Sequence, residues 1–403
     1  MIYRTRHIEK QIFRAIGLLL ICLLVLIALP VADAQKPVSV AQPIQEHQVY
    51  LPLSLRYAPP YQLFVPLYLS PASAPAHMQS ARSPSYTSQS RQQGGLSNLF
   101  VRRVGEDLQL DGQLYTFIGT NVSYLAGPFF PEEKAEEIIA FLADNGVQVI
   151  RVWVEPWCDL DRVERMLDMG RIYNIRFILT LQDFFGKQDG WWFKSVYLTK
   201  DLPHIRNIVP RFANRPEVLM WELMNEPTCP AQDANPSCWN AFVHWAQATS
   251  QEIKALDANH LVSVGTQRAG FDEDAIEAFR RVHALDTIDI MSVHWGVEGL
   301  PEKELAIAHE LGKPVYFGEI AMRGLDESCQ PLSSDALQQR AEAIAQSILR
   351  SREAGVDGYL LWQYAYGAVE MGDHKEYYCG VYDYFADDPV WQVIRSVSSS
   401  LTR

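Results

Sequence analysis

Short apolar runs alternate with segments of helical periodicity from about residue 98 to the end of the chain. One helical segment begins at Pro131 and ends at Gly146, and its apolar residues recur at helical spacing: Ala135, Ile138, Ile139 and Leu142. Eight apolar runs are separated mostly by such segments: YTFIGTNVSYL, VQVIRVWV, IRFILTLQDFF, VLMWELMNEP, HLVSVGT, IDIMSVHWG, KPVYFGEIAM and GYLLWQYAY. Strands that alternate with helices in this way predict an α/β protein with a (β/α)8 TIM barrel. An open doubly wound sheet is the alternative, but no glycine-rich phosphate turn follows the first strand.

Residues 1–34 have the pattern of an export signal. Basic residues precede an apolar run from Ile16 to Leu29, and the small-residue sequence ADA follows it. We expect cleavage after Ala34 and a secreted, extracellular protein. The alternative is an uncleaved N-terminal membrane anchor, although the run is shorter than the ~20 residues that span a bilayer.

Residues 35–97 are rich in Pro, Ser and Gln, and they predict a disordered linker or N-terminal extension. Two similar apolar stretches, VYLPLSLR at 49–56 and LFVPLYLSP at 63–71, interrupt this composition. Docking of these stretches on the barrel, or on a neighbour at the cell surface, is left open. Residues 98–403 then form the barrel, which we expect to be the catalytic domain and a monomer.

The composition narrows the class of partner. The formal net charge is -13, from 35 Lys and Arg against 48 Asp and Glu, so the surface repels phosphate backbones and excludes nucleic acid as a partner. The chain has 10 Trp and 18 Tyr. Such aromatics stack on the apolar faces of sugar rings, but a large core would use them equally well.

Five cysteines follow the export signal. Cys229 and Cys238 bracket a short loop, and we expect a disulfide between them. Cys329 and Cys379 follow two late strands and are candidates for a second disulfide, which would leave Cys158 unpaired. Because the cysteine spacings match no common zinc pattern, no structural metal is predicted.

Candidate chemistry lies at the ends of the apolar strands, because a (β/α)8 barrel forms its active site at the carboxyl ends of its strands. Two glutamates, Glu226 and Glu319, end strands that are otherwise apolar. A single buried glutamate usually forms a structural ion pair, but two at strand ends, with Arg151 on a third strand, favour catalysis. The polar and aromatic residues at the strand ends are Asn121, Arg151, Gln182, Asp183, Asn225, Glu226, His294, Glu319 and Trp362.

Paired carboxylates suit the hydrolysis of glycosidic bonds. One carboxyl group must be protonated to assist the departing sugar oxygen, while the other must be ionised to attack the anomeric carbon. Burial and like-charge repulsion raise the pKa of the acid, and a nearby arginine keeps the nucleophile charged. A separation of ~5 to 5.5 Å between the carboxyl groups gives retention of configuration. Glutamates supply acid, base and nucleophile, so no cofactor is predicted.

The motifs VIRVW, WELMNEP, VYFGEIA and LLWQY resemble those of retaining (β/α)8 glycoside hydrolases, and within that clan glycoside hydrolase family 5. The resemblance covers roughly residues 98–395. It implies double displacement, with Glu226 as general acid/base and Glu319 as nucleophile.

The same resemblance implies roles for four further residues. Asn225 would bind the 2-hydroxyl group of the sugar, and Arg151 would orient the nucleophile and keep it ionised. His294 matches the family's histidine on the sixth strand. Trp362 matches the tryptophan that stacks under the sugar.

The chain departs from the family pattern at two places. Gly296 stands where the family usually has a tyrosine that contacts the nucleophile, and Trp295 or a tyrosine from a loop is a candidate replacement. The third strand ends in LQDFFG and lacks the usual histidine. Both departures bear on the choice of sugar and leave the reaction class unchanged.

The expected substrate is β-1,4-mannan. The segments GTNVSYL with Asn121, RVW and WELMNEPTC are similar to the β-1,4-mannanase branch of the family. QDFFGKQDGWWF, with Asp183, Trp191 and Trp192, resembles the aspartate- and aromatic-bearing loop of those enzymes. Trp191, Trp192 and Phe193 would form either a stacking platform in the cleft or a hydrophobic plug under a loop.

Other functions are also compatible with the sequence. Within the family, the alternatives are an endo-β-glucanase of the cellulase type and an exo-β-glycosidase. Outside enzymes, the barrel would be a non-catalytic carbohydrate-binding protein or the scaffold of a surface-anchored interaction protein.

Overall fold

The computed structural model describes residues 99–127, 130–183, 191–230, 234–326, 330–365, 367–371, 374–378 and 381–401. All of them lie in one compact unit, within Pro71–Arg403. The expected export signal (1–34) and the expected extension (35–97) lie outside the described residues.

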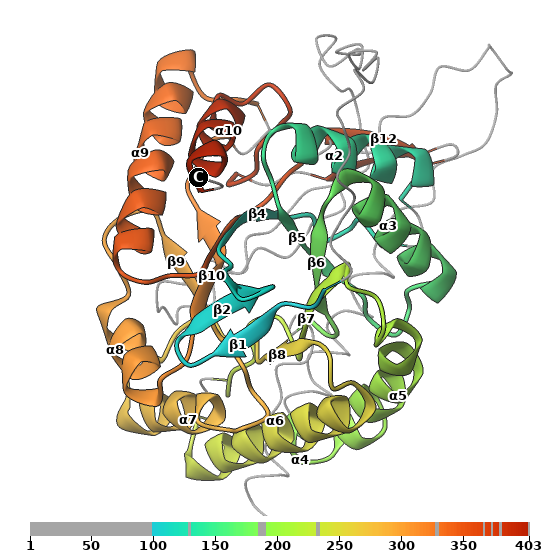
Figure 1. Ribbon diagram of the computed structural model, residues 1–403, viewed down its shortest axis with the longest axis vertical. Helices are drawn as coiled ribbons and strands as arrows, with labels where there is room; N and C mark the ends of the chain where they lie inside the picture. Colours follow the sequence, from blue (N-terminus) through green and yellow to red (C-terminus); the bar gives the residue numbers. More distant parts are fainter. Residues whose placement is uncertain are drawn as a thin grey trace, which may run out of the picture. The chain divides into compact units, whose positions relative to one another are not determined.

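Eight parallel strands form the barrel predicted from the sequence (Figure 1). Hydrogen-bonded neighbours follow the order β8-β7-β6-β5-β4-β11-β10-β9, and a parallel bridge between Ser263 and Ile290 joins the two outer members of this order. The strands are β4 (Phe117–Asn121), β5 (Val149–Trp153), β6 (Arg176–Thr180), β7 (Val218–Glu222), β8 (Leu261–Ser263), β9 (Met291–Gly296), β10 (Val315–Ala321) and β11 (Gly358–Leu361).

Helices surround the barrel and cover its outer face (Figure 1). The segment predicted after Pro131 is helix α2, which buries Ala135, Ile138, Ile139 and Leu142, as its periodicity indicates. The helices are α2 (Glu132–Asp144), α3 (Leu160–Tyr173), α4 (Trp191–Lys194), η2 (Val196–Leu198), α5 (Asp201–Phe212), α6 (Pro236–Leu256), α7 (Glu273–His283), α8 (Glu302–Leu311), α9 (Ser334–Glu353) and α10 (Val390–Leu401).

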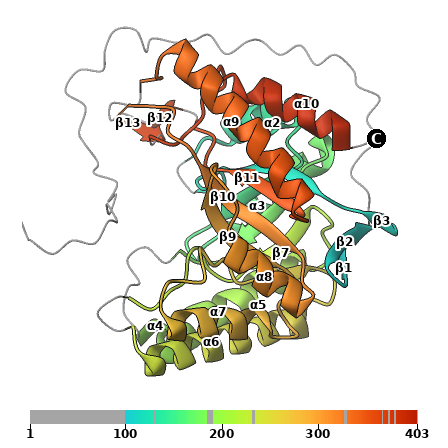
Figure 2. The same ribbon diagram turned by 90° about the vertical axis from the view of Figure 1, so that its left-hand side faces the viewer.

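Two small antiparallel sheets were not predicted. One contains β1 (Arg102–Val104), β2 (Asp107–Leu110) and β3 (Gln113–Leu114), and the other pairs β12 (Gly367–Met371) with β13 (His374–Tyr378). Leu108 of β2 is fully buried in a cluster with Phe117 and Val149, which begin barrel strands, so the first sheet closes the amino end of the barrel. Figure 2 shows the two small sheets on opposite sides of the barrel.

The cysteines follow the expectation as far as they are described. Cys229 and Cys238 form a disulfide, and Cys158 is free and buried. Cys329 and Cys379 lie outside the described residues, so the second disulfide stays a prediction. No helix in the described ranges is both long enough and apolar enough to cross a membrane.

Removing the disulfide should lower stability modestly. We expect the double variant Cys229→Ser, Cys238→Ser to lose ~2–3 kcal/mol of unfolding free energy, because the crosslink closes a short loop, with residues 9 apart in sequence. Thermal unfolding should show this as a fall in Tm of several degrees, ~2–4 °C per kcal/mol. A Tm of the double variant equal to that of the unaltered, oxidised protein would contradict this.

Candidate active site

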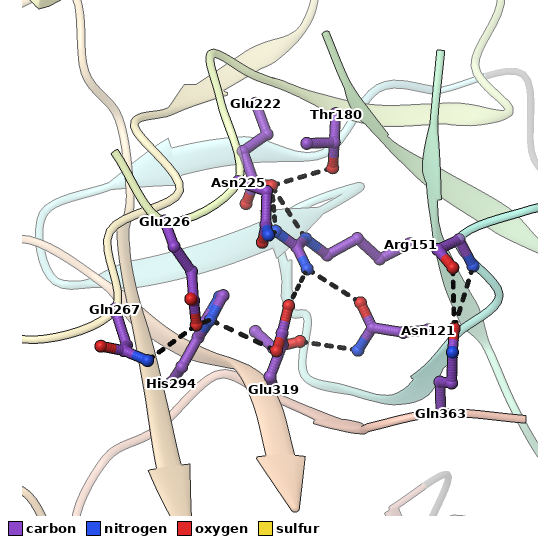
Figure 3. Close-up of polar contacts among 12 residues, drawn as sticks. Asn121, Arg151, Thr180, Glu222, Asn225, Glu226, Gln267, His294, Glu319 and Gln363 are labelled. Carbon is purple, nitrogen blue, oxygen red and sulfur yellow. Dashed lines mark hydrogen bonds and ion pairs between the residues drawn. The ribbon is translucent and has the colours of Figure 1, made fainter. Parts of the chain in front are cut away.

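The two strand-end glutamates face one another at the carboxyl end of the barrel, with His294 beside both (Figure 3). A carboxylate oxygen of Glu226, one of Glu319 and a ring nitrogen of His294 all lie within 4.8 Å of one another. Nδ1 of His294 lies 2.7 Å from Oε1 of Glu226 and 3.5 Å from Oε2 of Glu319. The barrel therefore brings together three residues that the sequence separates widely.

The backbone of Glu226 adopts a conformation that non-glycine residues rarely use. Its φ is 47°, in the left-handed region. The turn is held on both sides, because the Glu226 N–H donates to the Gly265 carbonyl (2.9 Å) and the Asn225 N–H donates to the Gln182 carbonyl (2.8 Å). Local strain of this kind persists when the surrounding structure fixes the chain, and it is typical of functional positions.

Arg151 is fully buried and connects the site. Its guanidinium donates to Glu319 (2.7 Å), Asn121 (2.9 Å), Asn225 (2.7 Å) and Glu222 (2.8 Å). The rigid fork of donors on β5 thus fixes four side chains, which come from β4, from β7 and its end, and from β10, in one arrangement. Arg151 thus contacts Glu319, and its role in orienting a nucleophile and keeping it ionised stays a prediction.

Glu222 is a member of the site that sequence reasoning did not identify. It is fully buried and accepts hydrogen bonds from Arg151, from Thr180 (2.9 Å) and from the Tyr316 hydroxyl. The signal was present, because Glu222 lies on the same strand face as Glu226 in the period-two alternation of a strand. Glu222 is a second anionic partner for Arg151, so the positive charge of the arginine is shared between Glu222 and Glu319.

Asn121 supports Arg151 from inside the barrel. Its Oδ1 accepts from Arg151, and its Nδ2 donates to the carbonyls of Gly318 (2.9 Å) and Leu361 (3.0 Å). Since its side chain is fully buried and its polar atoms are bonded within the protein, it positions Arg151. Its expected contact with substrate stays a prediction.

Burial and hydrogen bonding move the two glutamate pKa values in opposite directions. Burial raises the pKa of Glu319 to about 7, against the attraction of His294 and Arg151. Burial is the largest single influence on Glu226 and raises its pKa, but the hydrogen bonds from His294 and Gln267, with the charges of His294 and Arg151, together outweigh it and lower the net pKa. These directions are the reverse of those expected from the sequence for an acid at Glu226 and an ionised nucleophile at Glu319. The physical reason is that the charge of Arg151 is shared with Glu222, whereas His294 donates to Glu226.

Asp183 and Trp362 lie beside this centre. Asn225 Nδ2 donates to Asp183 Oδ1 (3.2 Å), which links the ends of β6 and β7. The half-buried Trp362 packs edge-on against Trp153, with ring centroids 5.8 Å apart, and Trp153 in turn stacks on Arg151. Trp362 is therefore held next to the charged network while part of its ring stays accessible.

The other three tryptophan candidates are occupied differently. Trp295 donates from Nε1 to the Glu298 carbonyl (3.2 Å), and the Arg268 guanidinium lies 4.3 Å from its ring centroid. Trp295 therefore contacts residues of the loops that follow β9 and β8. Trp192 donates to Asp201 (3.1 Å) from α4. Trp191 is 66% exposed on the same short helix. A sugar-stacking role for these residues stays a prediction.

Gly296 leaves open space at the mouth of the barrel. A Cβ atom added there would meet nothing within 4 Å, and its backbone is not in the left-handed region that requires glycine. Its register partner on β10 is Ala321, two residues beyond Glu319. In the described residues, Trp295 does not hydrogen-bond to Glu319, so the replacement considered for the family's tyrosine is not made in this way.

The three residues Glu226, His294 and Glu319 also have the atom types and spacing of metal ligands. Their closest approaches are already accounted for by hydrogen bonds and by the ion pair to Arg151. The absence of a metal and of a cofactor stays a prediction.

The chain is similar to known glycosidases. The model of GH family 5 beta-mannosidase-like proteins matches residues 202–301. A probable mannan endo-1,4-beta-mannosidase A of Aspergillus oryzae is 22% identical over 71% of this chain and 85% of its own length. The structure of an endo-1,4-beta-mannanase from Rhizomucor miehei superposes with a TM-score of 0.59 at 17% identity, over 75% of this chain and 99% of that chain. A family 5 mannosidase from the same organism, in complex with mannosyl-fructose, gives 0.60 at 18%, over 76% and 98%.

Replacing Arg151 by methionine should destabilise the fold. The buried carboxylates of Glu222 and Glu319 would lose their shared cation, which typically costs about 3–5 kcal/mol. The loss should narrow as pH falls from 8 towards 5, because Glu319, whose pKa burial raises to about 7, can then take up a proton and lose its charge. Chemical denaturation at several pH values measures this.

The matched control is Arg206→Met. Arg206 pairs with Glu252 on the surface, where solvent screens the pair, so its removal should leave the unfolding free energy almost unchanged at every pH. Equal losses for the two variants would show that the buried network does not depend on the charge of Arg151.

Proposed function

We propose, from the confirmed resemblance of this chain to glycoside hydrolase family 5, that this glycosidase is a retaining enzyme that cleaves β-1,4-linked polysaccharide, with mannan as its substrate. The observation that carries the proposal is the approach of Glu226 and Glu319 at the open end of the barrel. The oxygen separation is compatible with the close carboxyl pair of retaining enzymes, whereas inverting enzymes leave room for a water between the two groups.

The first step joins the sugar to the enzyme. Glu319 attacks the anomeric carbon, the glycosidic C–O bond breaks, and its electron pair stays on the leaving oxygen, which takes a proton from Glu226. Oε1 of Glu319 is bound by Arg151, so Oε2 is the oxygen available for attack. The product is a glycosyl ester of Glu319.

The second step reverses the proton transfer. Glu226, now ionised, takes a proton from water while the water oxygen attacks the anomeric carbon. The ester bond breaks, and its electron pair returns to the Glu319 carboxylate. Two inversions at one carbon give net retention.

The pKa directions of Glu226 and Glu319 fit this scheme when the two carboxylates are treated as a pair that holds one proton. Before substrate binds, the higher pKa lies on Glu319. Positive charge that develops on the sugar over Glu319 favours its ionised form, and the leaving oxygen draws the proton to Glu226. His294, close to both carboxylates, donates to whichever is ionised.

The substrate assignment is supported by the relatives. Curated proteins that match this chain include several named mannan endo-1,4-beta-mannosidase, among them one from Podospora anserina that is 21% identical over 61% of this chain and 82% of its own length. Cleavage of β-glucan is the alternative within the same mechanism, and endo action follows only from those names. Asn225, held by Arg151 and Asp183, would meet the sugar's 2-hydroxyl group.

The biological setting is part of the proposal. An export signal at 1–34 and an extension at 35–97 would deliver residues 98–403 outside the cell as a monomeric catalytic domain. The extension could keep the domain at the cell surface. Recovery of the protein in culture medium, with its amino terminus beginning after Ala34, tests this directly.

The Glu319→Ala variant should abolish turnover without unfolding the protein. Removing the nucleophile leaves no route to the ester, so release of reducing ends from mannan, glucomannan and carboxymethyl-cellulose should fall by about 10³-fold or more. Circular dichroism and Tm serve as controls for folding. Full activity of this variant on any of these substrates would refute the proposal, and binding of mannan without cleavage by the unaltered protein would indicate a carbohydrate-binding barrel instead.

The pH dependence of kcat/KM should be bell-shaped with an alkaline limb near neutrality. The pair must carry one proton, and burial raises the pKa of Glu319 to about 7, so activity should fall about tenfold per unit above that value. On the acid side, the lowered pKa of Glu226 should keep the pair singly protonated below the ordinary glutamate range. Initial rates at subsaturating substrate between pH 3 and 9 measure both limbs, and a rate that stays constant to pH 9 would contradict this.

A further inference from the structure

Gln267 makes a contact with Glu226 that neither the sequence pattern nor the family resemblance indicated. Its Nε2 donates to Oε1 of Glu226 at 2.9 Å (Figure 3). The residue lies in the loop between β8 and α7, and its backbone carbonyl accepts from the His294 N–H (2.8 Å). Gln267 therefore connects the strand end that carries the histidine with the carboxyl group of Glu226.

The loop that carries Gln267 is anchored beyond this contact as well. The Ala269 N–H donates to the buried carboxylate of Glu304 (2.9 Å), and the Lys303 ammonium donates to the Gly270 carbonyl (2.9 Å). Both anchors come from α8. The exposed amide of Gln267 is thus presented to Glu226 from a fixed backbone.

Two donors converge on the same oxygen of Glu226. His294 Nδ1 lies 2.7 Å from Oε1, and Gln267 Nε2 lies 2.9 Å from it. In the described part of the chain, no residue hydrogen-bonds to Oε2 of Glu226. Oε1 is therefore the fixed oxygen, and Oε2 is the one available for proton transfer to and from the sugar oxygen or water.

We propose that Gln267 is a positioning residue that holds Glu226 in its ionised, base-ready form and thereby speeds hydrolysis of the glycosyl-enzyme, the second half of the reaction. The inference rests on the proposed retaining mechanism. In that second half the Glu226 carboxylate takes a proton from water, the water oxygen bonds to the anomeric carbon, and the bond to Glu319 breaks with its electrons returning to that carboxylate.

The direction of the effect follows from the charge on Glu226. A hydrogen bond to an ionised group is stronger than one to a neutral group, so the Gln267 amide favours the carboxylate over the acid. The hydrogen bond from Gln267 contributes to the lowered pKa of Glu226. The second step requires Glu226 as a carboxylate, because it then takes a proton from water. The first step requires Glu226 as an acid, because it then gives a proton to the leaving oxygen. Gln267 should therefore help the second step and slightly oppose the first.

The test is the Gln267→Leu variant, which keeps the size of the side chain and removes the donor. The substrate is an aryl β-glycoside with an activated leaving group, which needs little acid assistance, so the first step is fast. We expect kcat to fall about tenfold, the order of one hydrogen bond to a charged group, while kcat/KM stays within about twofold. A pre-steady-state burst of the phenol should appear or grow, because the glycosyl-enzyme accumulates.

Two further readouts separate this role from a structural one. Azide, a nucleophile that needs no general base, should restore turnover of Gln267→Leu on the activated substrate. The acid limb of the kcat/KM profile on a substrate with a poor leaving group should move to higher pH, because loss of the Gln267 hydrogen bond raises the pKa of Glu226. A looser loop would produce neither effect.

Lys303→Ala is the matched control, since it removes an anchor of the same loop that does not touch Glu226. It should show no burst, no azide rescue and no shift of the pH profile. Equal falls of kcat and kcat/KM in Gln267→Leu, with no burst and an unmoved pH profile, would overturn the proposal. Inactivity of the unaltered protein on every β-glycoside would overturn the proposed function instead, so the two failures are distinguishable.

Discussion

A permanently charged guanidinium buried at the end of a barrel must find an acceptor for each of its donors, and this requirement organises the whole site. Arg151 meets it with two carboxylates and two side-chain amides drawn from different strands. Each of these partners is thereby fixed in position and in rotamer. The same bonds that satisfy the cation thus hold Glu319 and Asn225 beside each other, and structural necessity and proposed catalysis use one network.

The electrostatic balance of the site follows from the number of carboxylates around that cation. Glu222 and Glu319 both pair with Arg151, so the arginine neutralises one negative charge and leaves the other poorly compensated. Glu226 adds a third carboxylate, which His294 and Gln267 stabilise by hydrogen bonds to one of its oxygens. A site of this composition holds a proton near neutral pH for physical reasons, before any substrate is present. Proposed acid–base chemistry would use that proton.

Much of this arrangement could be predicted from the sequence, because the spacing of apolar residues indicates the strands and helices, and the position of a residue along a strand indicates which end of the barrel it occupies. Apolar runs identified the barrel strands, and the rule that function lies at their carboxyl ends brought Glu226, Glu319, Arg151 and His294 to one place. The β1–β3 sheet could not be predicted, since its strands are only two to four residues long and half of their positions face solvent.

Side-chain partnerships were harder to predict than strands. Gln267 lies in an irregular loop, where neither periodicity nor a motif gives the direction of a side chain. The opposite pKa shifts of the two glutamates depend on distances to Arg151, Glu222 and His294 that a one-dimensional pattern does not contain. Glu222 could be predicted in part, because strand alternation places it on the same face as Glu226 but does not indicate its bond to Arg151.

The left-handed backbone at Glu226 has a consequence for how this position can drift in evolution. Glycine or asparagine would occupy the turn with less conformational cost than glutamate, and valine or isoleucine with more. If selection for a carboxylate were lost, substitution by glycine or asparagine would therefore be expected before substitution by valine or isoleucine. The glutamate at this turn is therefore not the residue that the backbone conformation alone would favour.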